Sequence, residues 1–256
     1  MGLLSADTTP EAEKVQFEIY RSMGALGRLR LVASSILECW TLAKKSATAD
    51  PTRRWLGQAP PKELERSLTP MQPLQTPLRL ARILTSLRLN YVIGGSYASS
   101  LHGEPRATRD CDFLTDIGLD DLDSLEQAVK DEFYISRSAA DEAVRLKRCF
   151  NLIHLKTGFK VDIFVSEGRD FDKERLSRAL PIELDGQVLN FSTAEDTILA
   201  KLEWNSLNST EQQQRDILGI LLLQGDKLDF GYLKHWAQDL GLKASLEELL
   251  AKVGLL

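Results

Sequence analysis

Two aspartates separated by one residue, Asp110-Cys111-Asp112, open an apolar run and could bind a cation together. Side chains alternate between the two faces of a β-strand, so both carboxylates would project from one face, about 7 Å apart along the backbone. Cys111 would then face the core of the sheet. Taken alone, the aspartate pair is also compatible with a surface loop rich in aspartate.

A third aspartate, Asp162, lies inside the apolar run Lys160–Val165. An ionised carboxylate on a buried strand is costly without a partner, so its presence needs an explanation. One explanation is an edge strand whose polar face meets water. The other is a third metal ligand on a strand beside Asp110 and Asp112, because three carboxylates supply the oxygen-only ligands that suit Mg²⁺.

The sequence Gly94-Gly95-Ser96 follows the apolar run Tyr91–Ile93, which is typical of a strand that ends in a tight turn before a helix. Glycines let backbone N–H groups approach a phosphate, and a helix start favours negative charge. Arg106 and Arg109 lie between this turn and the aspartate pair and could bind phosphate or substrate anions. The alternatives are an ordinary turn and a solvated loop.

The elements that would position these residues follow from hydrophobic periodicity. Because helices separate the first strands and a hairpin follows them, the sheet must be mixed rather than purely parallel. The sequence predicts a helix at 78–89, a strand at 91–93, a helix at 96–102, a strand at 111–114, a helix at 119–131, and a hairpin of 144–155 with 159–165.

Residues 10–46 have helical spacing, with Pro10 in the first turn and Val15, Ile19 and Met23 on one face. A second helix is expected from about Leu26 to Lys45. A stretch rich in Pro, Gln, Thr and Ser then reads as a linker. The sequence therefore divides into an N-terminal helical extension (1–47), a Pro-rich linker (48–76), a core (77–192) and a C-terminal helical bundle (193–256).

The composition of the chain argues against several classes of protein. The 256 residues include 32 basic and 37 acidic side chains, a formal charge of −5, so no overall positive charge draws the chain to nucleic acid or anionic lipid. Three cysteines without CxxC spacing argue against a disulfide framework or a zinc site. No apolar run resembles a membrane span or a secretory signal, which favours a cytoplasmic protein.

Three motifs, Gly94-Gly95-Ser96, then residues 102–113, then Val161-Asp162-Ile163-Phe164, together resemble the signature of minimal nucleotidyltransferases of the DNA polymerase β superfamily. The resemblance is closer to the bacterial toxin-type group of abortive-infection and toxin–antitoxin systems, and it covers about residues 78–225. It implies an α+β fold, a nucleotidyltransferase-type mixed sheet with flanking helices. Residues 10–46 resemble small helical proteins encoded beside such enzymes, which implies an antitoxin-like partner or an N-terminal regulator in cis.

The resemblance also implies a reaction: Mg²⁺-dependent transfer of a nucleoside monophosphate from an NTP such as ATP to a hydroxyl of RNA, for example tRNA, or of protein. Two Mg²⁺ ions are expected, with Mn²⁺ as a substitute. The implied catalytic and metal-binding residues are Asp110, Asp112 and Asp162, and the implied nucleotide-binding residues are Gly94, Gly95, Ser96, Arg106, Arg109 and Lys201. Asp196 or Asp216 would steady Lys201, although an ordinary ion pair is favoured for Asp216.

Two other functions stay open. The first is a non-catalytic nucleotide-binding or interaction module on the same fold, against which the presence of all three carboxylates speaks. The second is transfer to a small hydroxylated molecule, as in antibiotic-modifying relatives of the superfamily. Residues 1–47 do not resemble the N-terminal regions of those relatives. Binding of an NTP without release of pyrophosphate would favour the module.

Overall fold

The computed structural model describes residues 9–45, 73–207 and 210–255. These residues form two compact units. Among the described residues, the helical unit draws on 9–31, 95–106, 192–207 and 210–255, and the sheet unit on 32–45, 73–94 and 107–191. Residues 48–72 of the predicted linker (48–76) lie outside the described residues. The division into four segments therefore stays a prediction.

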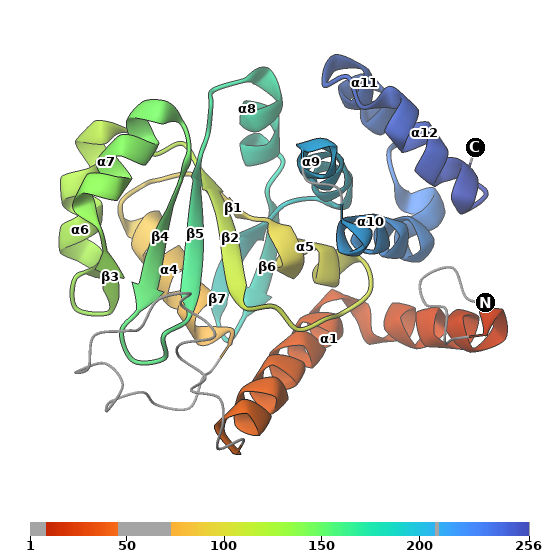
Figure 1. Ribbon diagram of the computed structural model, residues 1–256, viewed down its shortest axis with the longest axis horizontal. Helices are drawn as coiled ribbons and strands as arrows, with labels where there is room; N and C mark the ends of the chain where they lie inside the picture. The colour runs from red at the N-terminus through yellow and green to blue at the C-terminus, as the bar shows by residue number, and fades with distance from the viewer. Residues whose placement is uncertain (1–8, 46–72, 208–209, 256) are drawn as a thin grey trace. The chain divides into compact units, whose positions relative to one another are not determined.

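A seven-stranded sheet forms the centre of the sheet unit, in the order β3-β4-β5-β2-β1-β7-β6 (Figure 1). The pairs β2–β5 and β1–β7 are parallel, and the other neighbouring pairs are antiparallel. The sheet is thus mixed, as the sequence predicted. Its strands are β1 (Tyr91–Ile93), β2 (Asp110–Thr115), β3 (Phe133–Ile135), β4 (Cys149–His154), β5 (Lys160–Val165), β6 (Leu180–Leu184) and β7 (Gln187–Phe191).

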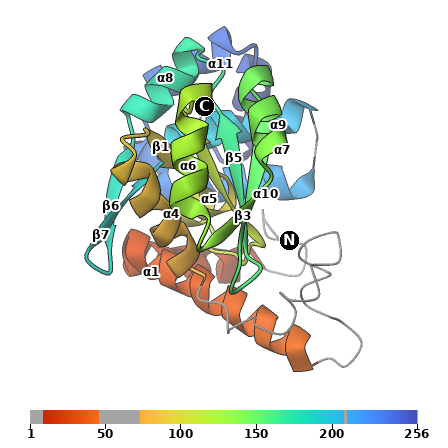
Figure 2. The ribbon, with the colours of Figure 1, turned by 90° about the vertical axis from the view of Figure 1, so that its left-hand side faces the viewer.

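Helices bury their apolar faces around this sheet. In α4, Leu80, Ala81 and Leu84 are buried, and the helix packs against α6 and β7; α4 and α6 lie side by side in Figure 2. Helix α7 packs against α6 and β4. The helices that lie wholly within the sheet unit are α4 (Gln75–Ser86), the short η1 (Leu119–Asp121), α6 (Leu122–Val129), α7 (Arg137–Leu146) and α8 (Asp170–Ser177).

The sheet unit differs from the sequence prediction at several elements. The strand predicted at 144–155 begins only at Cys149, because Val144 lies on the buried face of α7. Lys147, with a φ of 52°, caps that helix in the left-handed region before the strand starts. Helix α8, strand β3 and the hairpin of β6 and β7 were not predicted. Helix α8 and strand β3 have too few apolar residues to show a clear period. The hairpin had a signal in the sequence, because Asp185-Gly186 joins two alternating apolar runs, and both residues have positive φ values, 51° and 74°.

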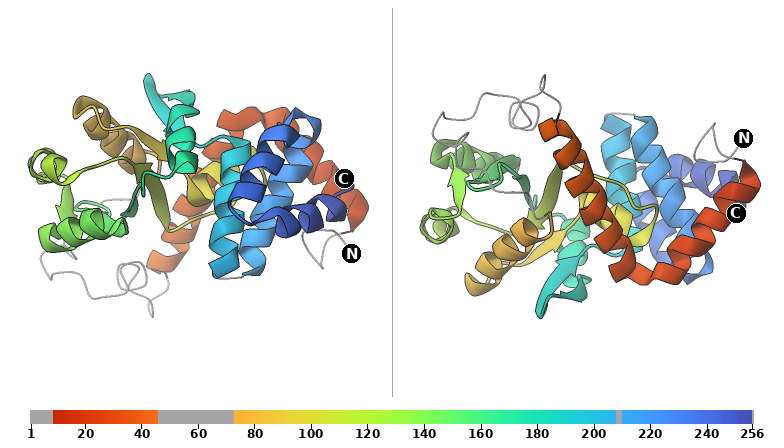
Figure 3. Two further views of the ribbon diagram at one scale, coloured as in Figure 1. Left: turned by 90° about the horizontal axis from the view of Figure 1, so that it is seen from above. Right: turned by 90° about the horizontal axis from the view of Figure 1, so that it is seen from below.

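The predicted C-terminal helices are confirmed. Ile217, Ile220 and Leu221 of α10 are buried, and α10 packs against α5 and α9, while α11 packs against α9 and α12. Figure 3 shows α9 to α12 next to one another from above and below. The bounds are α5 (Gly95–His102), α9 (Ala194–Leu207), α10 (Glu211–Gln224), the short η2 (Gly225–Lys227), α11 (Phe230–Asp239) and α12 (Lys243–Lys252). No described helix is both long and apolar enough to cross a membrane.

The N-terminal helix α1 (Pro10–Lys45) is broken at Gly24, whose φ of 64° and ψ of 178° are open essentially only to glycine. Two helical segments were predicted here, and the structure has them. The face that carries Val15, Ile19 and Met23 is exposed, whereas Phe17 is buried. Apolar spacing correctly predicted a helix, but the face that its apolar residues share is not the face that the structure buries.

Candidate functional site

The carboxylates of the aspartate pair lie on one face of the sheet. Asp110 and Asp112 alternate on β2 with Cys111, which is fully buried as predicted. Strands β2 and β5 are parallel neighbours, with Asp112 opposite Asp162 in register. Residues that pair across neighbouring strands project from the same face. All three aspartates therefore share one face at the middle of the sheet.

A lysine that the sequence analysis did not single out lies among these carboxylates. The Nζ atom of Lys160 is 2.7 Å from Oδ2 of Asp162 and 3.6 Å from Oδ2 of Asp110. Burial alone would lower the pKa of Lys160, but the hydrogen bond and the negative charge of Asp162 raise it overall. Asn151 of β4 donates a hydrogen bond from Nδ2 to Oδ1 of Asp162. Both oxygens of Asp162 thus have a donor.

The donor chemistry fits a divalent cation, since three carboxylates share a face and oxygen ligands suit Mg²⁺. The thiol of Cys111 does not compete, because burial and the charge of Asp112 raise its pKa well above the usual value. In the part of the chain that the structure describes, however, no group of three or more His, Cys, Asp or Glu side chains is arranged to hold a metal ion. The Lys160 ammonium contacts both Asp110 and Asp162 in this structure.

The glycine turn is built as the sequence predicted. The N–H of Gly94 donates to the carbonyl of Asp112 over 2.9 Å, which ties the end of β1 to β2 in the sheet unit. Gly95, with a φ of 52°, adopts the left-handed conformation at the start of α5. In the helical unit, Ser96 accepts a hydrogen bond from Nη2 of Arg106 over 2.7 Å.

A buried carboxylate organises the basic residues of the helical unit. Asp216 on α10 accepts two hydrogen bonds from Arg106, each 2.9 Å long, and one of 2.7 Å from Nζ of Lys201 on α9. Gln212 adds a hydrogen bond of 2.8 Å. Burial would raise the pKa of Asp216, but the hydrogen bond from Arg106 and the charges of Lys201 and Arg106 lower it to about 2. We call these residues the Asp216 cluster.

Of the two acids expected to steady Lys201, Asp216 pairs with it. Asp196, the other acid, accepts a hydrogen bond of 2.6 Å from the hydroxyl of Tyr232 and one of 2.8 Å from Thr193. Arg109, the remaining basic candidate, lies exposed directly before β2. The structure thus brings Arg106 and Lys201 to Asp216 in the helical unit, where Ser96 is hydrogen-bonded to Arg106. It brings Asp110, Asp112 and Asp162 to one face of the sheet unit.

Three residues of these groups escaped the sequence analysis. Lys160 had a readable signal, because it stands two positions before Asp162 on a strand and must share its face. Asn151 and Gln212 had none, since polar amides are common on solvated strand edges and helix faces. Their places became evident only from pairing and packing.

Comparison with known proteins gives only distant likenesses. No protein-family model and no curated protein matches the sequence. Solved structures that resemble the chain include an antigenic nucleotidyltransferase-like protein from Paracoccidioides brasiliensis, with 18% identity and a TM-score of 0.43 over 70% of this chain and 91% of that one. The antibiotic-resistance factor ANT(2'')-Ia is 15% identical, with a TM-score of 0.42 over 72% of this chain and 97% of that one. Likenesses at TM-scores below 0.5 establish neither family nor activity.

Proposed function

We propose that the chain transfers a nucleoside monophosphate from an NTP to an acceptor hydroxyl. The observation that carries this proposal is the register of β2 and β5, which sets Asp112 beside Asp162 with Asp110 two residues away on the same face. Three carboxylates on one face of a mixed sheet are hard to explain as structure alone, because like charges repel and gain nothing from packing.

Two features of the proposal rest on the sequence resemblance. One is a toxin-type role, with tRNA or another RNA, or a protein, as acceptor. The other is control by an antitoxin-like partner or, in cis, by the N-terminal helix α1. A cytoplasmic location belongs to the same proposal.

The proposed reaction makes one bond to phosphorus, breaks another, and moves one proton. The acceptor oxygen bonds to the α-phosphorus, the bond from that phosphorus to the oxygen bridging to the β-phosphate breaks, and pyrophosphate leaves with the electron pair. The acceptor proton passes to the carboxylate of Asp162, whose orientation is fixed by Asn151 and Lys160. When bound, Mg²⁺ or Mn²⁺ ions held by Asp110, Asp112 and Asp162 would supply charge neutralisation and a more acidic acceptor hydroxyl.

The phosphate-binding role falls to Ser96, Arg106 and Lys201. The Arg106 side chain is 28% exposed, so its guanidinium reaches solvent, whereas the Lys201 side chain is 6% exposed and donates to Gln213 and Asp216. Arg106 is therefore the cation of this cluster that is better able to meet a phosphate, and Lys201 chiefly supplies countercharge. Gly94, Gly95 and Arg109 complete the proposed set.

A second candidate function is a nucleotide-binding module without catalysis. The observation that favours it is the position of Lys160, which contacts Asp110 and Asp162 as a metal ion would. If this ion pair is permanent, the carboxylates stabilise the sheet rather than bind a metal.

The test uses the full chain with each α-³²P-labelled NTP and Mg²⁺. Separate reactions contain total RNA, protein lysate or a mixture of aminoglycosides, so that the labelled fraction identifies the acceptor class. We expect labelled acceptor and released pyrophosphate, both reduced to background in the double variant Asp110→Asn/Asp112→Asn. The matched control is Asp120→Asn, an exposed aspartate of the same unit outside the carboxylate face.

Two results would overturn the assignment. Transfer that persists in the double variant would remove the aspartate pair from the mechanism. Binding of an NTP to the wild-type chain without pyrophosphate release in any reaction would instead support the module.

A further inference from the structure

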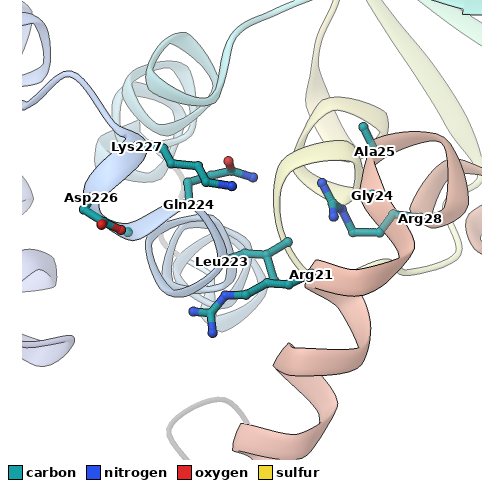
Figure 4. A pocket seen from close by; sticks show the side chains of 9 residues that line it. Arg21, Gly24, Ala25, Arg28, Leu223, Gln224, Asp226 and Lys227 are labelled. Carbon is teal, nitrogen blue, oxygen red and sulfur yellow. The ribbon is translucent and has the colours of Figure 1, made fainter.

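A pocket of about 450 Å³ lies in the helical unit, where α1 bends (Figure 4). Its volume is within the range of small-molecule binding sites. Three of its lining side chains are positive and one is negative, a net charge of +2, although the whole chain carries −5. The pocket is lined by Arg21, Gly24, Ala25, Arg28, Leu223, Gln224, Gly225, Asp226 and Lys227.

Arg28 gives this pocket a buried positive charge. The residue is 6% exposed, and its guanidinium donates two hydrogen bonds to the carbonyl of Leu101, of 2.8 and 2.6 Å, and one of 2.8 Å to the carbonyl of Tyr20. Both acceptors are neutral, and no carboxylate among the described residues pairs with it. Burial lowers the pKa of Arg28, yet a guanidinium stays charged at physiological pH. The buried guanidinium of Arg28 therefore has no negatively charged partner among the described residues, and an anion bound in the pocket would supply one.

Arg21 and Lys227 add donors at the exposed side of the pocket. Nη2 of Arg21 donates to the carbonyl of Leu222 over 2.5 Å, which occupies one of the five N–H groups of a guanidinium. Lys227 forms no ion pair with any residue that the structure describes. In Figure 4, Gln224 and Lys227 extend from the α10 and η2 side, and Arg21 and Arg28 from the α1 side.

The backbone at the bend adds further donors. Because Gly24 is non-helical, a new helical segment starts at Ala25, and both residues line the pocket. The first N–H groups of a helix lack acceptors within the helix and carry partial positive charge. Such a start beside arginines is a favourable place for phosphate oxygens.

We propose that this pocket binds a small phosphate-bearing anion through Arg21, Arg28, Lys227 and the backbone at Ala25. None of these residues belongs to the proposed nucleotidyl-transfer set, so the site is an additional one. A phosphate satisfies the pocket better than a carboxylate, because its oxygens diverge in three dimensions and can meet donors from both walls at once. The phosphate can come from free orthophosphate or from a mononucleotide.

A competing explanation is that the arginines only cap helix ends. Arg28 does meet the carbonyl of Leu101 near the end of α5, and Arg21 that of Leu222 near the end of α10. Capping does not account for Lys227, nor for the empty space between the basic groups.

The test is isothermal titration of the full chain with orthophosphate and, separately, with AMP, in buffer without divalent cations. We expect binding that weakens about tenfold for each basic group removed in Arg21→Gln and Lys227→Gln, and more in the double variant. Both residues are exposed, so these variants should fold even if an Arg28→Gln variant does not. Arg30→Gln, an exposed arginine of the same helix outside the pocket, is the matched control and should bind as wild type.

The arms of the experiment separate the possible results. Tighter binding of AMP identifies a nucleotide as the source of the phosphate, and equal affinities identify free phosphate. Binding that survives in Asp110→Asn/Asp112→Asn keeps this site independent of the proposed transferase activity. The proposal fails if neither anion binds, if the Arg21→Gln/Lys227→Gln variant binds as wild type does, or if Arg30→Gln weakens binding equally.

Discussion

Lys160 and Asp162, two residues apart on β5, form an ion pair in which Nζ lies 2.7 Å from Oδ2. The same ammonium lies 3.6 Å from Oδ2 of Asp110 on the neighbouring strand. A positive side chain therefore stands between two of the three carboxylates that the proposed reaction requires for metal binding. Whether a divalent cation competes with this ammonium can be measured.

Lys160→Met is expected to make the chain depend more on divalent cations. Without the ammonium, the three carboxylates repel one another, so the free energy of unfolding in EDTA should fall by about 1 kcal/mol. Mg²⁺ should then raise the melting temperature of the variant more than that of the wild type. The measurement is thermal unfolding with EDTA and with Mg²⁺, and Lys130→Met, at an exposed lysine of the same unit, is the control. Equal responses of all three proteins to Mg²⁺ would contradict a cation site at this face.

Asp216→Asn should strongly destabilise the helical unit. Lys201 is buried and Arg106 partly so, and the variant would leave both cations without their carboxylate. Removing one partner of a buried ion pair costs about 3 to 5 kcal/mol. Urea unfolding measures the loss, with Asp239→Asn, an exposed aspartate at the end of α11, as the control. A loss below about 1 kcal/mol would show that the cluster is solvated rather than buried.

Stability should decline in mild acid because of His102. Burial lowers the pKa of this imidazole to about 4, against a partial opposing effect of its 2.8 Å hydrogen bond to the carbonyl of Ser192. In the unfolded chain a histidine has a pKa of about 6.5. Between pH 6.5 and 4 the unfolded state therefore binds more protons, and the free energy of unfolding falls as the pH falls, by up to about 3 kcal/mol.

The check is urea unfolding from pH 7 to pH 4 for wild type and His102→Gln. The variant keeps a side-chain donor for the Ser192 carbonyl but cannot titrate, so its profile should be flatter. His235→Gln, on the exposed side of α11, should retain the wild-type profile. Parallel profiles for all three proteins would mean that His102 is not buried in the neutral form.

Gly103→Ala should disturb the contact between the end of α5 and α10. A β-carbon at Gly103 would lie 2.8 Å from the backbone nitrogen of Ile220 and 2.9 Å from the carbonyl carbon of Gly219. Both distances are too short for non-bonded atoms, so one of the two backbone segments would have to move. Overpacking of this kind costs roughly 1 to 3 kcal/mol. At Gly118 the nearest atom, Oδ2 of Asp121, is 3.4 Å away, so Gly118→Ala should change the free energy of unfolding by less than about 0.5 kcal/mol. Equal effects of the two substitutions in urea unfolding would refute the close approach.

Much of the fold could be predicted from local pattern. The run Tyr91–Ile93 is buried at every position, which an uninterrupted apolar run before two glycines indicates. The spacing of Ile217, Leu218, Leu221 and Leu222 predicted the α10 helix, and the structure buries every residue from 216 to 221. Helix α8 and strand β3 could not be predicted in this way, because α8 buries only Phe171 and Asp172 and β3 has three residues, too few for a period to emerge.

By itself, the sequence determined that Asp110 and Asp112 share a face, since alternation along a strand depends only on the residues in between. It could not determine that Lys160 lies between Asp110 and Asp162, because that follows from the parallel register of β2 and β5. Nor could it pair Arg106 with Asp216, which stand 110 residues apart and meet only where helices pack. The spacing of residues along the chain predicts their local geometry. The partner of a charged side chain depends on which distant segments the fold brings together.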